Sequence, residues 1–122
     1  MSESPRYNGA GMNDQDMTNL LDEITRRIRE VSDPEQIILF GSRARGDFGP
    51  DSDIDILVVK VGVDSPRQES VRLRRVLRGL PMPIDVLVAT PQHIQQYGNI
   101  VGMIYGPAVR EGRVLYARSR GT

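Results

Sequence analysis

Hydrophobic positions in the first half of the chain follow two spacings, and each spacing predicts one kind of element. From residue 17 to residue 31, apolar side chains recur every three or four positions, which is typical of an amphipathic helix that ends near Asp33-Pro34. Two short apolar runs, at residues 36–40 and 53–60, predict strands buried in a sheet. The segment between these runs contains glycine and predicts a loop.

The second half of the chain continues the alternation of helices and strands. A helix is predicted at residues 64–80 and another within residues 91–105, while residues 84–89 and 113–117 predict strands. Strands that alternate with helices imply an α/β fold. We therefore expect a small mixed β-sheet of about four strands, flanked by helices.

Both ends of the chain are predicted to lie outside this fold. Residues 1–16 are rich in Gly, Asn, Ser and Asp without hydrophobic periodicity and predict a flexible leader, and residues 119–122 predict a flexible tail. Residues 17–118 are the size of one compact domain. The chain has no cysteine and no run of about 18 apolar residues, so we expect a cytoplasmic protein without a membrane segment.

Positive and negative charges are balanced along the chain. The 16 Lys and Arg residues oppose 16 Asp and Glu residues, and the net charge is zero. A protein without an overall basic field is not expected to bind nucleic acid directly. The predicted helix at residues 64–80 nevertheless has an arginine-rich side, which either is a solvated surface or binds an acidic protein partner. This side carries Arg67, Arg74, Arg75 and Arg78.

Two aspartates at the start of the second predicted strand are candidates for a metal site. Asp53 and Asp55 are two residues apart in an extended segment, so their carboxylates point to one face, roughly 6–7 Å apart at Cα. Two like charges this close require a cation, and Mg²⁺ takes oxygen ligands from carboxylates and substrate phosphates. Gly41-Ser42, at the end of the preceding strand, can supply a tight turn and a hydroxyl for those phosphates. Together these residues predict a site for a metal-bound nucleotide.

A third aspartate has two interpretations. Asp85 lies in the otherwise apolar strand at residues 84–89, where an unpaired charge is costly, so it is expected to face a cation. If this strand neighbours the second one, Asp85 joins Asp53 and Asp55 in a cluster that can hold two metal ions. Alternatively, Asp85 forms a structural ion pair with an arginine of a helix.

The segment from Gly41 to Val58, GSRARGDFGPDSDIDILV, resembles the signature of the nucleotidyltransferases of the DNA polymerase beta superfamily. In that signature a Gly-Ser turn is followed by a loop and then by Asp-x-Asp on the next strand, here Asp53-Ile54-Asp55. The resemblance extends from the first helix to about Tyr116 and implies a polymerase-beta-type nucleotidyltransferase domain. Larger relatives, such as aminoglycoside nucleotidyltransferases and poly(A) polymerases, append a helical domain, and this chain is similar to the minimal form without one.

The resemblance implies two sets of site residues. The catalytic and Mg²⁺-binding set is Asp53, Asp55 and Asp85. The nucleotide-binding set is Gly41, Ser42 and Arg43. Two roles stay open: Asp85 is either a ligand of a second metal ion or the base that accepts the proton of the attacking hydroxyl, and Arg43 either contacts phosphate or forms a solvated ion pair.

The same resemblance implies a function. Minimal nucleotidyltransferases resemble the antitoxins that pair with an all-helical HEPN protein, often a ribonuclease, with which they can assemble. The implied reaction is the Mg²⁺-dependent transfer of AMP from ATP to a hydroxyl of that toxin, which silences it. Two alternatives remain: a nucleotide-binding module that neutralises its partner by covering it, and a catalytic subunit that modifies a small molecule such as an aminoglycoside.

Overall fold

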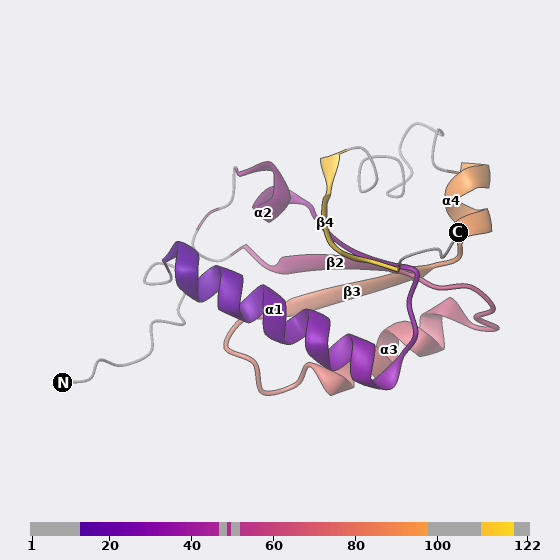
Figure 1. Cartoon of the computed structure of the whole chain (residues 1–122), viewed down its shortest axis with the longest axis horizontal. Coiled ribbons are helices and arrows are strands. Elements are labelled where there is room, and N and C mark those ends of the chain that lie inside the picture. The colour runs from indigo at the N-terminus through magenta and orange to yellow at the C-terminus, as the bar shows by residue number, and fades with distance from the viewer. Residues whose placement is uncertain (1–12, 47–48, 50–51, 98–110, 119–122) are drawn as a thin grey trace.

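The elements of the fold alternate as the hydrophobic pattern predicts (Figure 1). The structure is a computed structural model that describes residues 13–46, 49, 52–97 and 111–118. In chain order it contains α1 (Asp14–Val31), β1 (Gln36–Phe40), α2 (Ser42–Arg45), β2 (Ile54–Val59), α3 (Pro66–Val76), β3 (Ile84–Ala89), α4 (Pro91–Tyr97) and β4 (Arg113–Ala117). Each of the four predicted strands is present, with ends within one residue of those expected.

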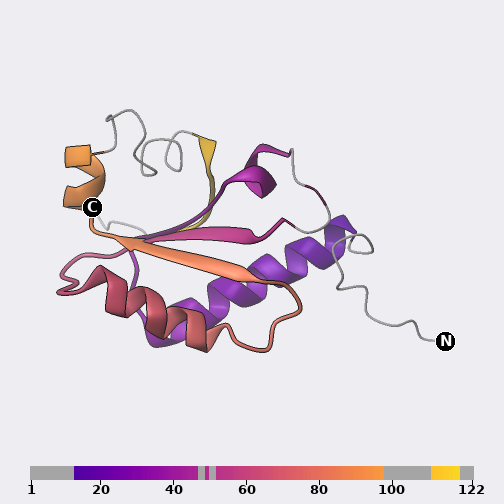
Figure 2. The same cartoon turned by 180° about the vertical axis from the view of Figure 1, so that it is seen from behind.

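The four strands form one mixed sheet in the order β3-β2-β1-β4. β1 is antiparallel to both of its neighbours, whereas β2 and β3 are parallel. The predicted small mixed sheet flanked by helices is therefore confirmed. α1 and α3 cover one face, and α4 lies on the other (Figures 1 and 2).

The larger hydrophobic cluster fills the space between the sheet and the helices α1 and α3. Ile54, Ile56 and Val58 point from β2 toward this side, as their two-residue spacing predicts, and all three are fully buried. Four residues of α1 and Leu73 of α3 complete the layer. The α1 residues are Leu20, Leu21, Ile24 and Ile28, one stripe of the amphipathic pattern.

A smaller cluster covers the opposite face of the sheet. Leu57 and Ile38 contribute buried side chains there, and Ile94 of α4 packs against them. Asp55 precedes Leu57 by two residues on the same face of β2, so its carboxylate points away from the main core. The pleat of β2 therefore separates the candidate acidic residues from the large apolar layer.

Three helical segments differ from the sequence-based expectation. α1 begins at Asp14 rather than at residue 17, because Asn13 and Asp16 form a reciprocal capping box. α3 ends at Val76 rather than at residue 80, although its apolar spacing continues into the following turn. The predicted loop after β1 begins with one helical turn, α2. Of the predicted helix within residues 91–105, α4 accounts for the first seven residues, and the segment 98–105 is outside the described residues.

Helix length and composition also bear on the membrane expectation. Among the described residues, no helix is both long enough and apolar enough to cross a bilayer. The longest one, α1, has 18 residues and carries charged residues along its exposed side.

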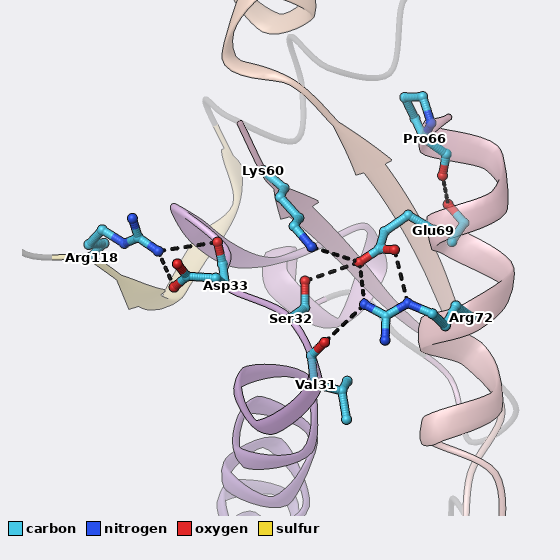
Figure 3. A network of polar contacts seen from close by, with 9 residues as sticks. Val31, Ser32, Asp33, Lys60, Pro66, Glu69, Arg72 and Arg118 are labelled. Carbon is cyan, nitrogen blue, oxygen red and sulfur yellow. Dashed lines mark hydrogen bonds and ion pairs between the residues drawn. The ribbon is translucent and has the colours of Figure 1, made fainter. Parts of the chain in front are cut away.

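A charge network joins α1, β2 and α3 at the end of β2 that is remote from Asp55 (Figure 3). The carboxylate of Glu69 accepts hydrogen bonds from Lys60 at 3.1 Å, from Arg72 at 2.7 Å and from the hydroxyl of Ser32 at 3.1 Å. These donors, Arg72 foremost, lower the pKa of Glu69 to about 2. Arg72 also donates to the carbonyl of Val31, at 3.0 Å. The network therefore fixes the C-terminal end of α1 against α3.

Candidate active site

The candidate site lies where β1 ends and β2 begins. Because these strands are antiparallel, the last residue of β1 is level with the start of β2, and Phe40 is the register partner of Asp55. Gly41 and Ser42 follow Phe40 directly, so they lie at the same end of the sheet as the two aspartates. The sequence motif is thus brought together by a single antiparallel pair of strands.

Gly41 is required by the close approach of its backbone to Asp55. Its φ of 76° lies in the left-handed region, which favours glycine. A Cβ atom at this position would clash with Oδ2 of Asp55. The carbonyl of Gly41 accepts hydrogen bonds from the N–H groups of Ala44 and Arg45, both at 3.1 Å, so the chain turns at once into α2. The half-buried Ser42 therefore begins α2 beside this contact.

Arg43 stabilises the segment immediately before β2. Its guanidinium donates two hydrogen bonds to the carbonyl of Ser52, from Nε at 3.1 Å and from Nη2 at 2.9 Å. Partial burial lowers the pKa of Arg43, and the nearby charge of Asp53 acts in the opposite direction. The side chain thus holds the carbonyl immediately before Asp53, a contact that sequence reasoning did not predict.

Asp55 is the electrostatic centre of the acidic group. Burial raises the pKa of this half-buried carboxyl, and the charges of Asp85 and Asp53 raise it further, while Arg45 opposes them. The exposed Asp53 lies one residue before β2 begins, and Asp85 is the register partner of Asp55 on β3. The charges of Asp53 and Asp85 thus both act on the carboxyl group of Asp55.

Asp85 differs from its expected environment. The sequence predicts a costly apolar setting, but the side chain is 58% exposed because it lies on the outermost strand. Its Oδ1 accepts a hydrogen bond at 2.6 Å from Arg74 of α3, which also donates to the carbonyl of Val86 at 3.2 Å. The ion-pair alternative is thus realised, and Asp85 is at the same time close enough to raise the pKa of Asp55.

The donor set has the chemistry that a hard divalent cation requires, because carboxylate oxygens from two adjacent strands gather beside a backbone turn. In the part of the chain that the structure describes, no three Asp, Glu, His or Cys side chains are placed so that they could hold a metal ion together. One of the candidate carboxylates, that of Asp85, is hydrogen-bonded to Arg74. The candidate residues therefore supply the oxygen ligands that a divalent cation prefers. In the described arrangement, however, the carboxylate of Asp85 is paired with Arg74 instead.

A mixed sheet with a Gly-Ser turn against Asp-x-Asp defines the class of nucleotidyl-transferring domains. Residues 21–109 match the nucleotidyltransferase domain family, and this span is well over half of the 122 residues. The chain belongs to that family.

Solved structures show the same fold at low sequence identity. A crystal structure from Sulfolobus solfataricus, described as that of a nucleotidyltransferase, has a TM-score of 0.62 and 23% identity, with 99% of this chain and 96% of that chain covered. A crystal structure of a toxin-antitoxin with AMP-PNP has a TM-score of 0.53 and 22% identity, with 80% of this chain and 73% of that chain covered. A comparison with curated proteins gives no significant match.

Proposed function

We propose that this nucleotidyltransferase transfers AMP from ATP to a hydroxyl of a HEPN-type toxin and so acts as its antitoxin. The observation that carries the proposal is the close approach of the Gly41 backbone to Asp55, beside Asp53 and Asp85. The similarity to a toxin-antitoxin structure with AMP-PNP supports both the adenine nucleotide and the protein partner. The residues at the site, oxygen ligands beside a backbone turn, are those that a metal-bound triphosphate requires.

In the proposed site, Asp53 and Asp55 would hold Mg²⁺, and Asp85 would either complete a second metal site or act as the base. When bound, Mg²⁺ supplies positive charge where the triphosphate accumulates negative charge. Turning Asp85 toward such a site requires that Oδ1 leave Arg74, an exchange within reach because both side chains are about half exposed.

The chain's own residues have distinct tasks in this proposal. The backbone at Gly41 admits the phosphates closely, and the hydroxyl of Ser42 donates to a phosphate oxygen. Arg43 contributes by fixing the carbonyl of Ser52, and hence the start of β2, rather than through a free guanidinium. The acceptor oxygen forms a bond to the α-phosphorus and the bond to pyrophosphate breaks. The acceptor proton passes to Asp85 if that residue is the base, and to solvent if Asp85 is instead a ligand of a second metal ion.

The proposal is tested by transfer of label. The protein is incubated with Mg²⁺, ATP labelled at the α-phosphorus and a HEPN-type protein, and label on that protein is measured. We expect label with the native chain and none with Asp53→Ala/Asp55→Ala. A matched control, Asp22→Ala/Asp64→Ala, removes two exposed carboxylates outside the site and should retain transfer.

The other outcomes separate the alternatives. If the partner is bound and silenced without label, and Asp53→Ala/Asp55→Ala still silences it, the protein is a binding module that acts by occlusion. If label appears on an aminoglycoside and not on a protein, the acceptor is a small molecule. Either result would contradict the proposed protein acceptor.

A further inference from the structure

Among the residues that the structure describes, no strand pairs with the outer side of β3, the first strand in the order β3-β2-β1-β4. The carbonyls of Pro83 and Ala89 accept hydrogen bonds from the β2 side, from Ile54 at 3.1 Å and from Lys60 at 2.9 Å. Because backbone groups alternate in direction along a strand, those of residues 84, 86 and 88 point outward, away from β2. The contact between Arg74 and the carbonyl of Val86 agrees with this direction. Figure 2 shows β3 on the outer side of the sheet with α3 below it.

A groove runs between this edge and α3. Its volume is about 440 Å³, and α3 and β3 both contribute to its lining. Val71 of α3 lines the groove and is 40% exposed. Leu87, half-buried, lines it from β3. The groove thus combines apolar side chains with an open row of backbone groups.

Arg67 of α3 lines this groove, and Arg75 lies in an adjacent hollow that Arg67 and Val71 also line, so positive charge borders the groove on the helix side. Arg67 and Arg75 are exposed, and within the described residues neither forms an ion pair with a carboxylate. The other two arginines of α3 are engaged, Arg72 with Glu69 and Arg74 with Asp85. Arg67, Val71 and Arg75 are four residues apart on the helix and therefore share one side. We call these three residues, with the outward backbone groups of residues 84, 86 and 88, the α3–β3 surface.

We infer that the α3–β3 surface binds an acidic, extended segment of a partner protein, which adds to β3 as a further strand. An open strand pairs with another backbone, and alternate acidic side chains of that segment would meet Arg67 and Arg75. A second copy of this chain would bring like-charged α3 helices together, which disfavours self-pairing. The phosphates of a nucleic acid could pair with the arginines, but a nucleic acid could not form the ladder of backbone hydrogen bonds along β3.

The α3–β3 surface goes beyond the proposed transfer of AMP, because binding there needs no nucleotide. Pairing along the whole edge requires Arg74 to release the carbonyl of Val86, after which its guanidinium can meet an acidic side chain of the added strand. The inference can therefore hold even if the transfer assay fails, and the reverse is also true.

The test uses a nine-residue peptide of alternating Glu and Val, added to the ¹⁵N-labelled protein without nucleotide or metal. We expect shifts in the amide signals of Ile84, Val86, Val88 and α3. The variant Arg67→Glu/Arg75→Glu should weaken binding at least about tenfold, because it places like charges beside the peptide. The control Arg113→Glu changes an exposed arginine on the opposite edge strand and should bind the peptide within about twofold of the native chain.

Four results would overturn the inference. The first is the absence of shifts in the β3 amide signals. The second is that a peptide with Lys in place of every Glu binds as tightly as the Glu-Val peptide. The third is equal binding by a control ligand that has the charge but cannot pair with a strand. One such ligand is the peptide N-methylated at alternate residues, and another is a single-stranded oligonucleotide of the same charge. The fourth is a dimer of the protein alone that perturbs the same β3 amides, since a second copy would then be the occupant.

Discussion

Asp55 and Asp85 are register partners in the parallel β2–β3 ladder, so their side chains rise from the same face of the sheet. They differ in surroundings: Asp55 is half-buried against Gly41, whereas Asp85 is exposed at the sheet edge and bonded to Arg74. The same ladder thus places two carboxylates side by side and gives only one of them a cationic partner on α3. This asymmetry makes the role of Asp85 testable apart from that of its ion pair.

We predict that Asp85→Asn and Arg74→Ala have unequal effects. If Asp85 belongs to the active site, Asp85→Asn lowers the rate of nucleotidyl transfer about a hundredfold. Arg74→Ala should leave the rate within about threefold and lower the unfolding free energy by less than about 1 kcal/mol, because the pair is solvent-exposed. Equal losses of transfer in the two variants would instead mean that Asp85 acts only through the ion pair.

We predict that Asp55→Asn abolishes transfer and yet makes the fold more stable at neutral pH. The pKa of Asp55 is raised in the folded state, so the folded protein holds this proton more tightly than the unfolded chain does. Ionisation above the raised pKa therefore costs stability, and the amide removes that cost, by up to about 1 kcal/mol for this half-exposed group. Urea unfolding as a function of pH measures the effect.

The gain in unfolding free energy of Asp55→Asn should vanish as the pH falls below the ordinary aspartate pKa, because residue 55 of the native chain is then protonated in both the folded and the unfolded state. Asp64→Asn, an exposed aspartate at the other end of β2, should leave the unfolding midpoint unchanged. If Asp55→Asn instead lowers the stability at neutral pH, favourable interactions of the Asp55 carboxylate outweigh its burial and its repulsion by neighbouring charges.

We predict that Gly41→Ala removes transfer, whereas Gly62→Ala does not. Both glycines have a φ of 76°, but a Cβ at Gly62 meets nothing within 4 Å, whereas one at Gly41 clashes with Asp55. Both variants should lose about 1–2 kcal/mol of stability from backbone strain. Only Gly41→Ala should also displace Asp55, with a loss of transfer of about a hundredfold. Comparable transfer rates would show that Asp55 moves aside without consequence.

We predict that Glu69 governs stability at acidic pH. Its pKa is lowered from an ordinary value of 4.5 to about 2, so the network contributes fully above the ordinary value and is lost as the pH falls through about 2. Glu69→Gln should lower the unfolding free energy by about 1–2 kcal/mol at neutral pH, and this difference should shrink near pH 2. Glu30→Gln, which breaks only an exposed pair with Arg26, should cost less than about 0.5 kcal/mol. A pH-independent difference for Glu69→Gln would refute the role of its charge.

The strands and the two faces of β2 could be predicted because local spacing determines them. Ile54, Ile56 and Val58 alternate with Asp55 and Leu57, and the pleat converts that alternation into a core side and a polar side. The proximity of Gly41 to Asp55 follows almost as directly, since it needs only an antiparallel pairing of neighbouring strands.

Contacts that depend on tertiary placement could not be predicted in the same way. Which arginine pairs with Asp85 is set by the position of α3 beside β3, and from the sequence the five arginines of the predicted helix are equal candidates. Ser32, Lys60 and Glu69 are distant in sequence, and each alone reads as an ordinary surface residue. Their network exists because the C-terminal ends of α1 and β2 lie beside the first turn of α3 (Figure 3).

The central position of β1 also has a consequence for how the chain is made. β1 is hydrogen-bonded on one side to β2, which follows it soon in the sequence, and on the other side to β4, at residues 113–117. During synthesis, the apolar strand Ile37-Ile38-Leu39 therefore has an open side until residues 113–117 have left the ribosome. A product interrupted before Arg113 would keep that side open and offer a hydrophobic edge to other chains. β4 thus completes the sheet by pairing with the side of β1 that is exposed in the nascent chain.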